Sequence, residues 1–155
     1  MLTERQFTLS EVIIKTSNRL RAIANRFVFR GSGITGSQFC ILRLLSKKNQ
    51  NATEILKLIG GTKSNLSQRI KSLAKTGLVA RVLSKKGSDH RNIYLKITPK
   101  GSRLVTNLMQ RFQKAARKLE KQFSEKELES QFKFLKKMNV IISTNEEKLP
   151  QIFQI

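Results

Sequence analysis

The apolar residues of this chain change their spacing near its middle. Two short segments, 79–83 and 93–97, are typical of β-strands, and in the second one apolar residues occupy every other position. The segment between them, SKKGSDHRN (84–92), is polar and contains a glycine, as a hairpin loop should. The spacing elsewhere is mostly helical. We therefore expect a mainly α-helical chain that contains one small β-hairpin.

Four helices are expected before the hairpin, separated by segments that contain glycine or polar residues. The last three each begin with an N-cap signal, and two of these signals are capping boxes, in which Glu or Gln follows three residues later. Gly77 is a suitable C-terminal cap for the fourth helix. The expected first helix covers about 7–29, and the later N-caps are Thr35 (with Gln38), Asn51 (with Glu54) and Thr62.

Strong helix signals also follow the hairpin. Thr98 is a suitable N-cap and Pro99 fits the first helical position, so a fifth helix is expected over about 99–123. Another capping-box pattern opens a sixth helix over about 124–143, and residues 145–155 are expected to form a tail. Two short helices joined by a glycine turn and followed by a hairpin form a winged helix-turn-helix. The second helix of such a pair enters the DNA major groove.

The charge of the chain is strongly unbalanced. Lys and Arg number 31 against 10 Asp and Glu, which gives a formal net charge of +21 and an isoelectric point near 11.0. Repulsion among so many positive charges opposes compaction of the chain unless a polyanion neutralises them. Nucleic acid or an anionic membrane surface would do so. Residues 61–103 hold eleven of the basic residues and a single acid, Asp89. This charge and the expected architecture together favour a nucleic-acid surface.

The fourth helix, expected over 62–76, has two distinct faces. At about 100° per residue its apolar side chains gather on one side, which we expect to pack inward. The opposite side carries short polar and basic residues without an acid, whereas an ordinary solvated face usually mixes both signs. Such residues can hydrogen-bond base edges and neutralise phosphates. The candidate DNA contacts are Lys63, Ser64, Asn65, Ser67, Gln68, Lys71, Ser72 and Lys75.

Several other classes of protein are disfavoured. A single cysteine excludes an internal disulfide and a Cys-based zinc site. The chain has no Gly-rich phosphate loop, no metal cluster and only one histidine, so neither an enzyme, a metal site nor a cofactor is expected. Asp89 precedes that histidine, His90, but successive side chains of a strand-like tip point opposite ways. The two side chains are therefore not expected to face each other as a catalytic Asp-His pair would. Without a membrane-length apolar run or a signal-peptide pattern, a cytoplasmic protein is expected.

Three motifs occur together in residues 60–101: the helix ending LAKTGLV, the hairpin motif SDHR and the helix start ITPKG. In combination they resemble the DNA-binding core of the multiple-antibiotic-resistance regulator (MarR) family, with ITPKG in place of the family's Leu-Thr-x-x-Gly. The segments ITGSQFCILRLL and NATEILKLIG resemble the family's second and third helices. The matching order of helices covers nearly the whole chain.

The resemblance implies a homodimeric winged-helix transcription regulator that binds duplex DNA at a pseudo-palindromic operator. Its first, fifth and sixth helices would interdigitate between subunits. Residues 1–34 and 98–155 would then form the dimerisation region and 35–97 the winged helix-turn-helix, within one compact domain. The recognition helix 62–76 would enter the major groove and the wing 84–92 the minor groove.

The resemblance also implies roles for four residues of the wing. Arg91 would reach into the minor groove, and Asp89 would pair with basic groups that hold the wing. Lys85 and Lys86 would contact phosphates. The chain departs from many relatives on the recognition helix: the relatives often have Arg where this chain has Gln68, and many have an acidic residue where it has Lys71. Base readout is therefore expected to differ, with more of the affinity coming from phosphate contacts.

The apolar stripes of the last two helices also favour a dimer. The fifth helix has a stripe that runs several turns from Leu104 to Phe123, and the sixth continues one from Leu128 to Ile142. A small wing region cannot cover that much apolar surface, so a partner subunit is an economical cover. The alternative is that both helices pack only on the first helix of the same chain.

Many relatives bind aromatic or phenolic acids, which implies a small aromatic effector here. Phe27, Phe39 and Phe112 are the candidate lining residues, although aromatic residues at helical spacing more often belong to the core. Cys40 has apolar neighbours on its helix and is expected to be a small core residue rather than a redox sensor.

Two other functions stay open. One is a basic RNA- or nucleoid-associated winged-helix protein with little sequence specificity, although the stacking aromatics of RNA readers are missing here except for Tyr94. The other is a membrane-surface binder, which would need the apolar stripe of the fifth helix exposed. We expect no membrane partner. The basic residues beside that stripe are Arg111, Lys114, Arg117, Lys118 and Lys121.

Overall fold

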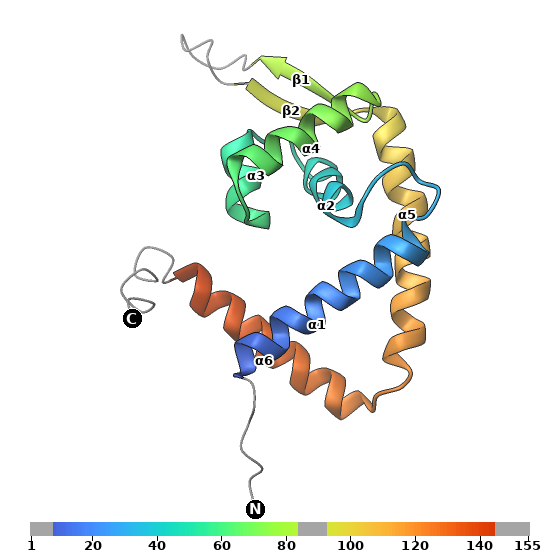
Figure 1. Ribbon diagram of the computed structural model, residues 1–155, viewed down its shortest axis with the longest axis vertical. Coiled ribbons are helices and arrows are strands. Elements are labelled where there is room, and N and C mark those ends of the chain that lie inside the picture. Colours follow the sequence, from blue (N-terminus) through green and yellow to red (C-terminus); the bar gives the residue numbers. More distant parts are fainter. Residues whose placement is uncertain (1–7, 84–92, 145–155) are drawn as a thin grey trace, which may run out of the picture. The chain divides into compact units, whose positions relative to one another are not determined.

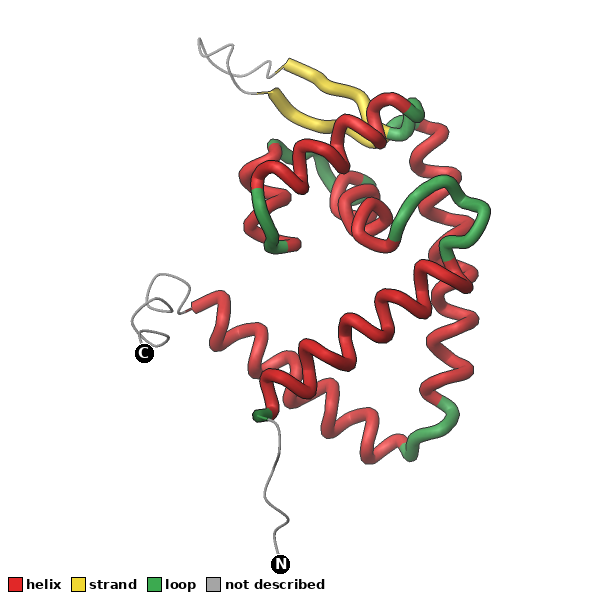
Figure 2. Tube along the Cα trace, viewed as in Figure 1, coloured by secondary structure: helices red, strands yellow, loops and turns green. Residues whose placement is uncertain are grey.

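The computed structural model describes residues 8–83 and 93–144. These residues are mainly α-helical, with one two-stranded antiparallel sheet, as the sequence predicts (Figures 1 and 2). They form two compact units, Met1–Gln113 and Lys114–Ile155, and helix α5 crosses the boundary. The elements are α1 (Leu9–Ile23), η1 (Ala24–Val28), α2 (Gly36–Leu45), α3 (Ala52–Ile59), α4 (Lys63–Lys75), β1 (Val79–Leu83), β2 (Ile93–Ile97), α5 (Pro99–Glu120) and α6 (Glu125–Thr144).

Helix α2 begins with the capping box expected from the sequence. Thr35 Oγ1 accepts a hydrogen bond from the backbone N–H of Gln38, and Gln38 Oε1 accepts one of 2.9 Å from the N–H of Thr35. Asn51 and Glu54 make the same reciprocal pair at the start of α3. These bonds satisfy N–H groups that have no partner inside the helix. Both capping-box predictions are confirmed.

A glycine turn joins α3 to α4. Gly60 and Gly61 have φ angles of +69° and +97°, which side chains rarely tolerate, so the chain reverses there only because both are glycine. Thr62 then caps α4 by accepting a hydrogen bond from the N–H of Asn65. At the other end Gly77 adopts a φ of +70°, and the strand β1 follows. The predicted limits of the fourth helix are confirmed.

The hairpin has the predicted strands, and its register pairs Val79 with Ile97 at the base. A third segment extends it beyond the sequence prediction. Gln50 exchanges two backbone hydrogen bonds with Leu95, of 2.8 and 3.3 Å, and this bridge ties the α2–α3 connection to β2. Gln50 is itself buried.

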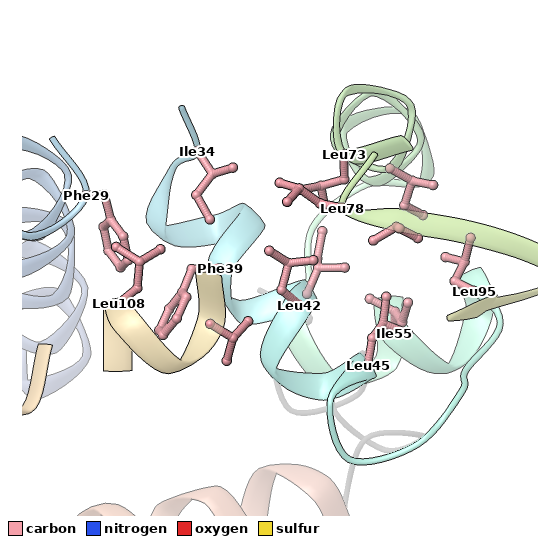
Figure 3. Packing of buried hydrophobic residues seen from close by; sticks show 14 of the residues in the cluster. Phe29, Ile34, Phe39, Leu42, Leu45, Ile55, Leu73, Leu78, Leu95 and Leu108 are labelled. Atoms are coloured by element: carbon pink, nitrogen blue, oxygen red, sulfur yellow. The ribbon is translucent and has the colours of Figure 1, made fainter. Parts of the chain in front are cut away.

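One apolar core holds the winged helix together (Figure 3). It gathers inward residues of α2, α3, α4, the hairpin and the first turns of α5, as the helical spacing predicts. A ring of Phe29 packs 5.1 Å from that of Phe39, centroid to centroid. The fully buried side chains are Ile41, Leu42, Ile55, Leu73 and Leu108.

The first helix is not regular throughout, contrary to the prediction of one helix over about 7–29. The α-helix ends at Ile23, and the N–H of Phe29 bonds to the carbonyl of Ala24, five residues back, in a π-helical turn. A contact from outside the helix accompanies this turn: the Arg111 guanidinium donates to the carbonyl oxygens of Phe27 and Arg30, each at 3.4 Å. Carbonyls satisfied in this way do not need regular helical partners.

The Lys114–Ile155 unit contains the end of α5 and all of α6. Helix α5 ends at Glu120, slightly before the expected residue 123, because the chain tightens into three-residue turns there. Ser124 and Glu127 then cap α6, and these hydrogen bonds lower the pKa of the Glu127 carboxyl below its ordinary value. Large apolar side chains of α6 are exposed, among them Phe132, Leu135, Ile141 and Ile142.

Candidate nucleic-acid interface

Helix α4 separates its residues into an inner and an outer side, as a spacing of about 100° per residue predicts. Leu66, Ile70 and Leu73 are buried in the core, and Arg69 is half-buried at the margin. The outer side therefore belongs to the surface of the Met1–Gln113 unit. All eight candidate contacts of this helix are exposed: Lys63, Ser64, Asn65, Ser67, Gln68, Lys71, Ser72 and Lys75.

The outer side of α4 carries uncompensated positive charge. Within the described ranges, none of Lys63, Lys71 and Lys75 makes an ion pair, and α4 contains no acid. Like charges on one helix face repel each other and weaken the helix slightly unless an anion lies nearby. The surface is therefore suited to a polyanion.

The other four candidate contacts, Lys85, Lys86, Asp89 and Arg91, lie outside the described residues, as does His90. What is described of the wing is its base, where β1 and β2 pair from Val79 to Leu83. Two exposed cations, Arg81 and Lys96, lie on these strands.

The C-terminal end of α4 is held by hydrogen bonds that the sequence did not reveal. Lys100 Nζ donates to the carbonyl oxygen of Thr76 at 2.8 Å, and Thr98 Oγ1 donates to the carbonyl oxygen of Gly77 at 2.7 Å. In the sequence Lys100 is only one of the eleven basic residues of 61–103, but in the structure its ammonium group caps the C-terminal end of α4. Thr98 Oγ1 also accepts from the N–H of Gly101, so one hydroxyl joins α4 to the first turn of α5.

A second unforeseen contact joins the first turn of α2 to the last turn of α4. Gln38, a buried residue of α2, donates from Nε2 to Ser72 Oγ on α4 at 3.0 Å. The capping box indicated a local role for Gln38, but nothing in the sequence connects residues 34 positions apart. Ser72 therefore has an inward partner as well as an exposed position.

A cavity of about 640 Å³ lies in the same unit and is lined by residues of α1, α2, α3, α4 and α5. Of the three candidate lining residues, Phe39 and Phe112 line this cavity, but Phe27 does not: its side chain is 63% exposed and stacks beneath the guanidinium of Arg26. Phe29 lines the cavity instead. Its three charged lining residues, Arg21, Arg43 and Arg69, come from three different helices, and no sequence signal indicated them.

Cys40 is exposed in the described structure and lines this cavity, so the expectation of a core cysteine is wrong. The inward positions of α2 are taken by Phe39, Leu42 and Leu45, three residues apart. Cys40 follows Phe39 by one residue, about 100° further around the helix, and so faces away from them.

Residues 8–83 and 93–144 contain neither a metal-ligand cluster nor a membrane-spanning helix. No three His, Cys, Asp or Glu side chains gather where they could hold a metal ion. None of the helices described is long and apolar enough to cross a lipid bilayer.

Comparison with known proteins agrees with this architecture. Residues 32–88 match the sequence pattern described as the MarR family. No curated protein sequence matches the chain significantly.

Solved structures of that family have the same fold. Apo MarR from Escherichia coli is 21% identical, with a TM-score of 0.73 over 85% of this chain and 97% of its own. BldR from Sulfolobus solfataricus is 20% identical, with a TM-score of 0.75 over 88% and 93%. MepR from Staphylococcus aureus in its DNA-binding conformation is 24% identical, with a TM-score of 0.70 over 88% and 99%. The family resemblance found in the sequence is therefore confirmed: residues 32–88 match the MarR family, and the chain has the winged-helix fold of MarR transcription regulators.

Proposed function

We propose that this protein is a homodimeric transcription regulator that binds duplex DNA in a sequence-specific manner at a near-palindromic site. The observation that carries the proposal is the outer side of α4, which is exposed, basic and free of acids on a winged-helix scaffold. In this arrangement residues 62–76 occupy the major groove, and the wing 84–92 reaches the minor groove.

Two groups among the exposed residues of α4 differ in their chemistry. Asn65 and Gln68 carry amides, which can bond an adenine edge with a donor and an acceptor at once. Lys71 and Lys75 are point charges suited to phosphates, and they lie one turn apart. Asn65 and Gln68 therefore contribute mainly to sequence specificity, and Lys71 and Lys75 mainly to affinity.

The wing is assigned by the family resemblance. Arg91 enters the minor groove, where a narrow A/T-rich groove concentrates negative potential. Asp89 holds the wing by pairing with basic groups, and Lys85 and Lys86 contact phosphates.

The dimer is supported by apolar surface in each compact unit. Helix α1 contains no buried residue, and Leu9, Val12, Leu20 and Ile23 are all about half exposed. Monomeric proteins rarely leave such faces uncovered, and a second copy covers them without another partner. Residues 1–34 and 98–155 then form the dimerisation region, and 35–97 bind DNA.

The 640 Å³ cavity is the proposed site of a small aromatic effector. Its size lies within the range of ligand sites, and its phenylalanines offer ring contacts. The three arginines favour a ligand that carries negative charge. Among the similar structures, NadR was solved with 4-hydroxyphenylacetate and PcaV with its natural ligand.

Competition binding tests the class of polyanion. A labelled mixed-sequence duplex is bound by the full chain and then challenged with single-stranded RNA or with anionic lipid vesicles. We expect unlabelled duplex DNA, added as a third competitor, to displace the labelled duplex more strongly than RNA or vesicles do, and the affinity to fall steeply as the salt concentration rises. Stronger competition by RNA would favour the RNA-associated alternative, and stronger competition by vesicles a membrane-surface protein.

A further inference from the structure

The amide of Gln38 has only one orientation that fits its neighbours. The backbone N–H of Thr35 is a donor, so the atom it meets at 2.9 Å must be Oε1 and not Nε2. The hydroxyl of Thr35 donates to the same oxygen at 3.2 Å. Nε2 must therefore be the atom that lies 3.0 Å from Ser72 Oγ, and it can only donate.

This orientation decides what the Ser72 hydroxyl can do. Because Oγ accepts from Gln38, its own proton is not needed for that contact. Serine in the middle of a helix often donates to the carbonyl four residues back. In the described part of the chain no such bond from Ser72 to Gln68 is formed, nor any other in which Ser72 Oγ donates. The exposed Ser72 hydroxyl can therefore donate a hydrogen bond to an acceptor outside the protein.

The position of Ser72 indicates which acceptor that is. The N-terminal residues of a recognition helix reach base edges, and later residues run beside the sugar-phosphate backbone. Ser72 lies in the last turn of α4, close to Lys71 and Lys75. A phosphate oxygen accepts hydrogen bonds only and carries charge, which strengthens a bond from a hydroxyl.

We propose that Gln38 is a positioning residue for DNA binding: its buried amide holds Ser72 as an acceptor on the inner side, so that the Ser72 hydroxyl donates to a phosphate oxygen of duplex DNA. The inference rests on the proposed function, because it requires the outer side of α4 to meet DNA. It adds a residue that does not touch DNA and yet determines how an exposed one does.

The substitution Gln38→Glu tests this polarity. Glutamate keeps the shape of the side chain and is equally suited to the capping box with Thr35. Its carboxylate accepts and cannot donate, so the Ser72 hydroxyl turns inward and donates its hydrogen bond to that carboxylate instead of to DNA. We expect about tenfold weaker binding to duplex DNA, uniform across DNA sequences, with an unchanged thermal unfolding midpoint.

A double-mutant cycle with Ser72→Ala separates this effect from repulsion between a new carboxylate and DNA. Ser72→Ala alone should cost about the same tenfold, since it removes the proton that Gln38 makes available. The pair together should bind about as weakly as either single variant. Ser72→Thr, which restores a hydroxyl, should recover most of the affinity when Gln38 is present.

Other results would overturn either the role of Gln38 or the phosphate contact of Ser72. Wild-type affinity in Gln38→Glu, or a full further tenfold loss when it is added to Ser72→Ala, would overturn the role of Gln38. A Ser72→Ala variant that changes the preferred sequence would overturn the phosphate contact. A wild-type protein that binds no duplex DNA would instead refute the proposed function, and the two failures are therefore distinguishable.

Discussion

The side-chain oxygen of Asn25 accepts a hydrogen bond of 2.7 Å from the backbone N–H of Gly36. Asn25 belongs to the π-helical turn η1, and Gly36 is the first residue of α2. The bond therefore joins the end of the first helix to the start of the helix-turn-helix, eleven residues later. It also satisfies an N–H group that α2 cannot satisfy itself.

Replacing Asn25 with Ala should lower the free energy of unfolding by about 1 kcal/mol, the usual effect of losing a side-chain cap at a helix N-terminus. Asn25→Asp retains the accepting oxygen and should remain close to wild type. Chemical denaturation of both variants gives the comparison. Equal stability of Asn25→Ala and the wild type would show that the bond contributes nothing.

Gly101 should not tolerate a side chain, although it lies inside helix α5. An added Cβ would collide with the carbonyl oxygen of Leu78 and would lie 2.8 Å from Ile97 Cγ1. Gly→Ala normally stabilises a helix, whereas Gly101→Ala should destabilise this protein by about 1–3 kcal/mol through overpacking. Ser102→Ala, an exposed neighbour, is the matched control and should be nearly neutral. A stabilised Gly101→Ala protein would contradict the close approach.

Gln68→Ala should alter the preferred DNA sequence, because the amide is assigned to base reading. Lys75→Ala should weaken binding to all sequences alike and reduce the salt slope by about one phosphate contact. Affinities for a panel of single-base variants of a bound duplex, measured at several salt concentrations, distinguish the two effects. If both variants lose affinity uniformly, Gln68 does not read bases.

Much of the fold followed from local signals, since caps and turns depend on neighbouring residues. The Thr35–Gln38 and Asn51–Glu54 pairs and the Thr98-Pro99 start could all be located from sequence. The contacts that were missed join distant segments: Gln50 to Leu95, Gln38 to Ser72, and Arg111 to the carbonyls of η1.

The same division applies to the candidate site. Helical spacing alone identified the exposed side of α4, because the burial of Leu66, Ile70 and Leu73 determines which way the other residues point. It could not identify the cavity arginines, since Arg21, Arg43 and Arg69 come together only when three helices pack. Phe27 was misassigned for a related reason, because a π-helical turn changes the angle between successive residues.

The exposed apolar side of α6 should control the oligomeric state. Phe132→Glu places a charge where its side chain is 65% exposed, and we expect it to shift the protein toward monomer. Ser130→Glu adds the same charge on another side of the helix, about 160° away, and should leave the dimer intact. Sedimentation velocity of both variants gives the answer. Equal assembly of the two proteins would place the dimer contact elsewhere.

The cavity should respond to a negatively charged aromatic compound. Adding 4-hydroxyphenylacetate, used as a probe, should raise the thermal unfolding midpoint, because a ligand that binds only the folded state stabilises it. Arg43→Gln should reduce this increase, whereas Lys47→Gln, which does not line the cavity, should leave it unchanged. An equal increase in both variants would show that Arg43 takes no part in binding.

Binding-site selection from a random duplex pool with this 155-residue protein shows whether it reads DNA as a sequence-specific dimer. We expect enrichment of an inverted repeat whose half-sites are centred about one helical turn apart, since each subunit of a dimer presents one α4 to a major groove. A pool that stays random after repeated rounds, or that yields no two-fold symmetry, would contradict a dimeric, sequence-specific regulator.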